Sequence, residues 1–85
     1  MRRSLIKMVR DKIDAGVLPL DAPVKLWLGT GSGQPCTVCG QRVLADEMEY
    51  EPQYNERGIV IRLHSACHRL WEAERRRRRH ASHDC

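Results

Sequence analysis

Four residues of this chain have the types and the spacing of a metal-binding set. Cys36 and Cys39 enclose two residues, and further along the chain His64 and Cys67 do the same. Two close pairs of donors, separated by enough chain for a hairpin, are the usual plan of a closed zinc site. Two thiolates in a tight turn can reach one tetrahedral ion without strain. The spacing therefore predicts one structural Zn²⁺ ion held by Cys36, Cys39, His64 and Cys67.

The residues around the first pair favour a metal turn. A redox-active Cys-x2-Cys pair opens a helix inside a βαβ unit. Here Pro35 precedes the pair and Gly40-Gln41-Arg42 follows it, which is the chemistry of a turn. Gly40 also lets the backbone turn past the ion. Zinc is therefore the preferred interpretation, with redox chemistry and a disulfide as the alternatives.

Other residues compete for a place in the metal site. His68 is the main rival to His64, but it directly follows Cys67 and so points about 100° away from it on a helix. Further candidates lie near the C-terminus, namely His80, His83 and Cys85. We expect residues 80–85 to form a disordered tail in which the last residue carries a free thiol.

Length and composition limit the class of protein. The chain has 85 residues, of which 41% are hydrophobic and 31% are charged. This is one domain, 1–85, whose apolar content is thin for a self-sufficient core, so a metal staple would stabilise it. There is no run of about 18 apolar residues, so neither a membrane span nor a membrane partner is expected. Charged residues from Lys7 to Lys12 argue against a secretory signal, and a zinc–thiolate site favours a cytoplasmic location.

Charge is distributed unevenly along the chain. Residues 2–12 carry five basic groups and one acid, and residues 46–56 carry five acids and no base. Residues 69–79 hold six Arg and two Glu, and the whole chain has a formal net charge of +4. Two basic ends flank an acidic middle, which predicts either a polyanionic partner or pairing between the blocks.

The N-terminal part predicts an amphipathic helix. Residues 3–15 carry an apolar stripe at helical spacing, formed by Leu5, Met8, Val9 and Ile13. Gly16 follows as the residue that ends the helix.

Residues 17–34 are predicted to be a linker. Within it, residues 24–28 alternate as a short strand does, and a short helix capped by Asp21 is the alternative. The Gly-rich loop at 29–33 lacks the Gly-Lys-Ser/Thr ending of a phosphate-binding loop. We therefore expect it to be a flexible connector into the metal turn.

A β-hairpin is predicted between the two ligand pairs, within a zinc-binding core over residues 35–75. Residues 47–51 alternate acidic and apolar, as a strand with one wet face does. A turn at 55–58 leads to the return strand at 59–64, which is rich in β-branched residues.

The last predicted element is a helix over residues 65–79, with Ser65 as its N-cap. Cys67, Trp71 and Glu74 share one stripe along it. The five consecutive arginines at 75–79 cover every side of its last turns, so we expect this end to project into solvent or onto a partner. Residues 76–85 are accordingly predicted to be a basic helix end followed by the tail.

The order of metal turn, hairpin and ligand-bearing helix resembles treble-clef zinc fingers, the group that includes LIM-type and PARP-type fingers. The matching residues are Cys36, Cys39, Gly40, the strands around Tyr50 and Ile61, and His64-x2-Cys67. The ligand order is that of the PARP-type finger in particular, and the likeness covers residues 35–75. It implies an α+β fold built on one zinc ion, to which this chain adds its N-terminal helix.

The wider pattern resembles a family of small, uncharacterised bacterial proteins. It is carried by Gly29-x-Gly31-x-Gly33-x2-Cys36-x2-Cys39-Gly40, Glu49-Tyr50-Glu51, His64-x2-Cys67 and Trp71-x2-Glu74-Arg75. This likeness covers nearly the whole chain and implies no particular activity.

The preferred function is a nucleic-acid-binding or transcription-regulatory module. The residues expected to contact phosphates of DNA or RNA are Arg69, Arg75, Arg76, Arg77, Arg78 and Arg79. The alternative is a protein–protein adaptor without nucleic-acid binding. It would use Trp27 and Trp71, the N-terminal apolar stripe, or the acidic strand at 47–51. Catalysis is not expected, because four protein ligands leave no open position on the zinc ion. The sequence does not indicate an oligomeric state.

Overall fold

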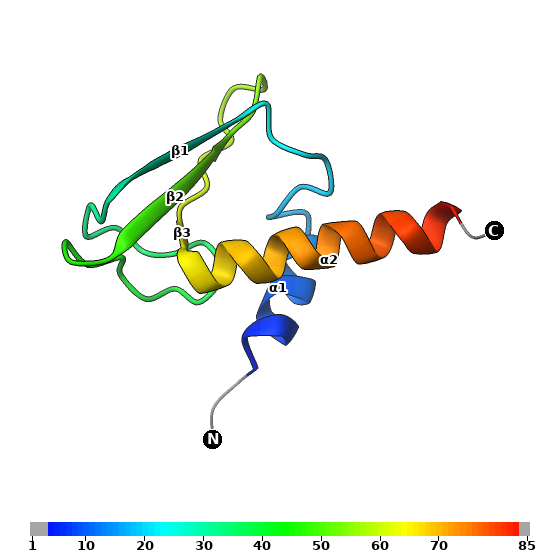
Figure 1. Ribbon diagram of the computed structural model, residues 1–85, viewed down its shortest axis with the longest axis horizontal. Helices are drawn as coiled ribbons and strands as arrows, with labels where there is room; N and C mark the ends of the chain where they lie inside the picture. Colours follow the sequence, from blue (N-terminus) through cyan, green and yellow to red (C-terminus); the bar gives the residue numbers. More distant parts are fainter. Residues whose placement is uncertain (1–3, 84–85) are drawn as a thin grey trace.

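The computed structural model describes residues 4–83. Within that range the chain forms two helices and a three-stranded antiparallel sheet, so the predicted α+β class is confirmed. The elements in chain order are α1 (Leu5–Asp14), β1 (Lys25–Thr30), β2 (Met48–Gln53), β3 (Leu63–His64) and α2 (Ser65–His83). Figure 1 shows the long helix α2 between the sheet and α1, which packs against it.

Helix α1 buries the apolar stripe that its sequence predicts. Its inward side chains are Val9 and Ile13, which are buried, and Leu5 and Met8, which pack beside them. The helix ends because Gly16 adopts a φ of +79°, and the N–H groups of Val17 and Leu18 then donate to the carbonyl of Lys12. Leu18, directly after this turn, is fully buried and ties the following linker to the core.

The sheet corrects the predicted hairpin. Strand β2 pairs with β1 over all six residues of each strand, from Lys25 opposite Gln53 to Thr30 opposite Met48. The strand predicted at 24–28 is therefore present, and it is the main partner of β2. Strand β3 pairs with β2 at only two positions, and residues 59–62 of the predicted return strand lie outside the sheet.

The metal turn explains why the return strand is so short. The N–H of Thr37 donates to the carbonyl of Arg62 at 2.7 Å, and the N–H of Arg62 donates to the hydroxyl of Thr37 at 3.1 Å. Both backbone groups of Arg62 are thus used by the metal turn, and a backbone group that is already paired is not available to a ladder. The segment joins β2 only after this point.

The acidic face predicted for residues 47–51 is not exposed to solvent at its central residue, Glu49. Glu49 is only 1% exposed, and its carboxylate accepts hydrogen bonds from the N–H and the hydroxyl of Ser32 at 2.9 and 2.7 Å. Arg62 lies 3.8 Å from the other carboxylate oxygen. Burial opposes ionisation, but the bonds from Ser32 outweigh it and hold the pKa of Glu49 below its ordinary value.

The Gly-rich loop is packed, in contrast to the flexible connector that its composition predicts. The N–H of Gly31 donates to the carbonyl of Glu47 at 2.9 Å. A Cβ atom on Gly31 would lie 2.0 Å from the carbonyl oxygen of Leu44, so only glycine fits at this crossing. The loop is therefore held in place beside the start of β2, and Ser32 in this loop bonds to the Glu49 side chain.

Helix α2 carries the centre of the core. Trp71 is fully buried, and its indole N–H donates to the carbonyl of Pro19 at 3.0 Å, which fastens the linker over the helix. The helix continues to His83, so the tail predicted to be disordered over 80–85 is helical as far as residue 83. Across residues 4–83, neither helix has the length and apolar character that a membrane crossing demands.

Candidate metal centre

The structure brings the four predicted ligands together. The donor atoms of Cys36, Cys39, His64 and Cys67 all lie within 4.8 Å of one another. A tetrahedral zinc ion, with bonds of about 2.3 Å to sulfur and about 2.0 Å to nitrogen, separates its donors by roughly 3.5–3.8 Å. The Cys39 sulfur and the His64 Nδ1 atom are 3.4 Å apart, close to that separation. The four residues are therefore positioned to hold one metal ion.

The first ligand pair is shaped by a tight turn. The N–H of Cys36 donates to the carbonyl of Gln41 at 2.8 Å, and the N–H of Gly40 donates back to the carbonyl of Cys36 at 2.9 Å. Gly40 has a φ of +77°, which closes this turn as predicted. The N–H of Val38 points at the Cys36 sulfur from 3.4 Å, so a backbone donor stabilises negative charge on that sulfur.

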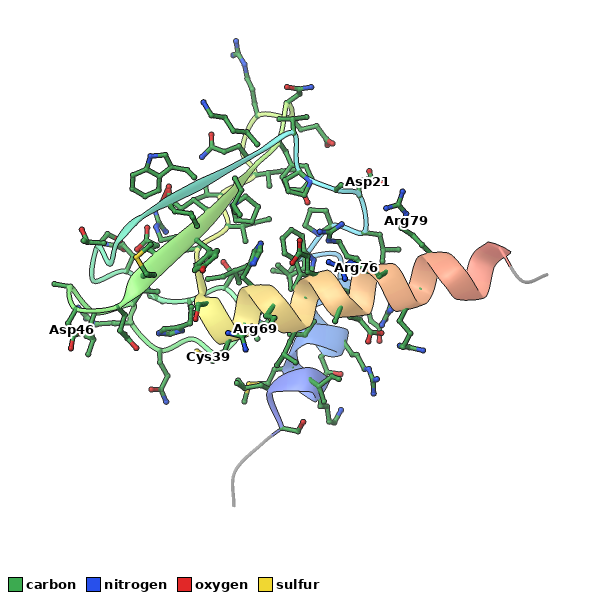
Figure 2. The ribbon with its side chains drawn as sticks, in the orientation of Figure 1. Asp21, Cys39, Asp46, Arg69, Arg76 and Arg79 are labelled. Atoms are coloured by element: carbon green, nitrogen blue, oxygen red, sulfur yellow. The ribbon has the colours of Figure 1, made fainter. Side chains whose placement is uncertain are left out.

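The second pair comes from the junction of β3 and α2. His64 ends the strand and Cys67 lies in the first helical turn, so both side chains face the metal turn. The Nδ1 atom of His64 faces Cys39, and Nε2 lies 3.2 Å from the carbonyl of Arg42. When Nε2 carries the proton, it donates a hydrogen bond to that carbonyl and leaves the Nδ1 lone pair for the ion, an outer-shell contact common in metal sites. In Figure 2, Cys39 lies beside the start of α2.

The clustered thiols perturb one another. A hydrogen bond from the Cys67 thiol lowers the pKa of Cys36 to about 4. The same bond raises the pKa of Cys67 far above its ordinary value, with burial adding to the effect, and burial raises the pKa of Cys39. Three thiolates so close together repel one another unless a cation lies between them. Three sulfurs and one imidazole are donors that suit Zn²⁺.

His68 is a core residue and lies outside the cluster. It is 8% exposed, and its ring stacks on Tyr50 with the ring centroids 4.8 Å apart. It also meets the edge of Trp71 at 5.9 Å. Burial lowers the pKa of His68, as expected for an imidazole that stays neutral. The side chains of His80 and His83, and all of Cys85, lie outside the part of the chain that the structure describes.

The arginine run is partly packed, which corrects the expectation that all of it projects outward. Arg75 is 6% exposed and lies with its guanidinium 4.6 Å from the ring centroid of Trp71. Next to it, the buried carboxylate of Glu74 accepts hydrogen bonds from the side chains of Arg10, Arg77 and Arg78. Helical spacing explains the bonds from Arg77 and Arg78, because side chains three and four residues apart on a helix are neighbours.

The sequence did not lead us to predict that Glu74 is buried and binds several arginines. The signal was present in its place on the stripe with Cys67 and Trp71 and in the arginines that follow three and four positions later. The arginine from α1, at position 10, could be found only from the tertiary structure, because 64 residues separate it from Glu74.

Four of the predicted phosphate-binding arginines remain exposed, and one of them, Arg77, is paired with Glu74. Arg69, Arg76 and Arg79 lie along α2 with exposed side chains (Figure 2). Arg76 lies 3.9 Å from Glu72, and Arg69 and Arg79 have no carboxylate partner among residues 4–83. At 100° per residue these three positions fall within one side of the helix.

Comparison of the chain with protein-family models, with curated proteins and with solved structures finds no match. The likeness to treble-clef fingers therefore stays a prediction.

Proposed function

We propose that this chain is a small module folded around one structural Zn²⁺ ion. The observation that carries the proposal is the meeting of four donors, from two segments far apart in sequence, within 4.8 Å. Four protein ligands complete the tetrahedral shell of a zinc ion. The ion then has no open position for water or substrate, so the proposal includes no catalytic step. Thiolate ligands must be reduced, and we therefore place the protein in a reducing cytoplasm.

Zinc would reinforce a junction that the hydrogen bonds between Thr37 and Arg62 and the apolar core already make. The turn at Cys36 and Cys39 and the β3–α2 junction at His64 and Cys67 face each other across the site. A chain of this size has a modest core, in which a closed metal site contributes directly to folding free energy. The ion thus acts as a structural cross-link.

Substitution of His64 and of His68, the two candidates for the nitrogen ligand, tests the ligand assignment. We expect His64→Gln to lose zinc, because Nδ1 is one of four donors, and His68→Gln to keep one zinc per chain. The measurement is metal content of the purified proteins by mass spectrometry of the elements, after dialysis against a weak chelator. His68→Gln is the matched control, since it removes an imidazole four residues away, one that packs on Tyr50 and Trp71 and lies outside the cluster of donors. Equal zinc loss in both variants would contradict the ligand assignment.

We further propose that α2 presents a basic surface to nucleic acid. Support comes from the exposed arginines at 69, 76 and 79, which lie on one side of the helix. Arg75 and Arg78 are packed within the fold. Arg77 is also exposed, but its guanidinium is paired with Glu74. Three phosphate contacts with duplex DNA predict a slope of about −2.7 in log affinity against log salt, or roughly a 40-fold loss from 50 to 200 mM. No base-reading group is included in the proposal.

Fluorescence anisotropy with a labelled DNA duplex and with single-stranded RNA tests this surface. The variant Arg69→Gln/Arg76→Gln/Arg79→Gln is expected to lose the salt-sensitive binding. The control Lys7→Gln/Arg42→Gln/Arg57→Gln removes the same charge elsewhere and is expected to keep it. Should the unaltered protein bind neither probe at low salt, nucleic-acid binding fails and the adaptor function becomes the working hypothesis, while the zinc assignment stands unaffected.

A further inference from the structure

Strand β1 is an apolar strand that the fold leaves uncovered. It is the end strand in the order β1-β2-β3, and in Figure 1 no other part of residues 4–83 lies along its outer edge. No residue of β1 belongs to the core. Leu26, Trp27 and Leu28 are 38, 46 and 47% exposed. Long apolar edge strands template pairing with another chain unless they are blunted by charge or proline.

The register shows which peptide groups face this open edge. The N–H of Gly31 donates to the carbonyl of Glu47, and these two residues continue the pairing of β1 with β2. In an antiparallel ladder, alternate residues direct their peptide groups to the same neighbour. Lys25, Trp27 and Gly29 therefore bond to β2. The N–H and C=O groups of Leu26, Leu28 and Thr30 point to the open side.

We propose that two copies of this chain form a dimer by antiparallel pairing of their β1 strands, centred on Trp27. With a two-fold axis at this residue, Leu26 of each copy lies opposite Leu28 of the other in a hydrogen-bonded pair. The two Trp27 residues then meet in the closer, non-hydrogen-bonded pair, where aromatic side chains interact well. Four leucines share one face of the joint and two indoles share the other.

The second copy is favoured as the occupant because the edge complements itself. The outward N–H and C=O groups of Leu26 in one copy bond to those of Leu28 in the other. On both faces of the joint, apolar side chains of one copy contact apolar side chains of the other. A register centred on Leu28 is poorer, because it places the polar Thr30 of one copy opposite Leu26 of the other. The result is one continuous six-stranded sheet.

The charges of the sheet permit this pairing. Lys25 is the one charged residue in β1, and in the antiparallel arrangement the two lysines lie at opposite ends of the joint, each opposite a Gly29. The acidic β2 strands are three strand spacings apart, about 14 Å, which exceeds the Debye length of about 8 Å at physiological salt. Repulsion between them is therefore screened.

The small area of the proposed interface indicates weak dimerisation. Two six-residue strands with their side chains bury an area at the low end of protein interfaces, below about 1,200 Å². We therefore expect a reversible dimer, with monomer dominant near 1 µM protein and dimer dominant near 1 mM, both to order of magnitude.

Sedimentation velocity of the full, zinc-loaded chain over this concentration range is the first test. Leu28→Lys places a charge against an apolar neighbour and is expected to weaken dimerisation by about tenfold or more. Leu28→Thr keeps strand propensity and is expected to weaken it less, which guards against misfolding of the lysine variant. Val60→Lys is the matched control, since Val60 is 67% exposed in the segment before β3, and it is expected to dimerise normally.

Hydrogen exchange of single amides, followed by NMR, then identifies the edge. In the dimer the amide of Leu26 is expected to exchange about tenfold or more slowly than in the Leu28→Lys monomer. The amide of Trp27, bonded to β2 in both states, is the internal reference. A protein that stays monomeric at 1 mM, a dimer in which the Leu26 amide stays unprotected, or equal dissociation of Val60→Lys and Leu28→Lys would each overturn the proposal.

Discussion

Glu74 shows how a single buried carboxylate organises the basic end of the chain. Its side chain is 1% exposed and is surrounded by Arg10, Arg77 and Arg78. The hydrogen bond from Arg77 is the largest cause that lowers the pKa of Glu74 to about 2, and Arg78 and Arg10 add to it against the effect of burial. A buried carboxylate of this kind needs its partners, because an unpaired buried charge is costly.

The pKa of Glu74 predicts how stability depends on pH. As the pH falls, the unfolded chain binds the proton first, near its ordinary value of 4.5, and the folded chain only near 2. The stabilisation is therefore complete above about pH 5 and is lost as the pH falls from there towards 2.

We expect Glu74→Gln to lower the free energy of unfolding at pH 7 by about 3 kcal/mol, as the shift in the pKa of Glu74 implies. Glu72→Gln is the control. Its carboxylate is 41% exposed and 3.9 Å from Arg76, so it should cost less than about 0.5 kcal/mol. Urea unfolding of both variants and the unaltered chain, at several pH values, measures this. A Glu74→Gln difference that stays constant down to pH 3 would show that the carboxylate is not the cause.

At the scale of elements, the Gly-rich loop is held by contacts that its composition does not reveal. Gly31 passes so close to Leu44 that no side chain fits, and Ser32 bonds to the buried Glu49. The loop thereby fixes the N-terminal end of β2, which the chain reaches after the metal turn.

Gly31→Ala is expected to destabilise the zinc-loaded protein by about 2–4 kcal/mol, because the added Cβ meets backbone that must shift. Gly33→Ala is the control for a nearby glycine. It has a φ of +81° with open space around it, so it carries only the cost of left-handed backbone, about 1–2 kcal/mol. Thermal and urea unfolding compare the two, and equal costs would mean that the close approach to Leu44 does not matter.

At the scale of the whole molecule, the metal site and the helix pair act together. The core lies where α1, α2 and the metal turn meet, and Trp71 is at its centre. Two of the proposed ligands, Cys36 and Cys67, are themselves part of this core. Loss of the proposed ion would therefore remove support from the core as well as from the site.

We expect chelation of zinc to unfold at least residues 35–75, because structural zinc in small fingers contributes on the order of 10–16 kcal/mol. Circular dichroism and the fluorescence of the buried Trp71, before and after addition of a chelator, follow this loss. The same chelator presaturated with zinc serves as the control. An unchanged spectrum and melting curve after removal of the metal would contradict a structural role for the ion.

Local spacing was sufficient to predict part of this protein. The ligand set, the stripe of α1 and its end at Gly16, and the start of α2 at Ser65 depend on residues close together in the chain, whose geometry short segments fix by themselves. Charge patterns were less informative, since the same acidic alternation fits an exposed strand and one that buries Glu49.

Only the tertiary structure decided which groups meet across long sequence distances. It gave β2 the strand β1 as its main partner in place of residues 59–62, and it buried Glu74 and Arg75 where a run of arginines predicted exposure. The physical reason is that pairing and burial depend on which polar groups find partners, and those partners, such as Thr37 for Arg62 and Arg10 for Glu74, come from remote segments.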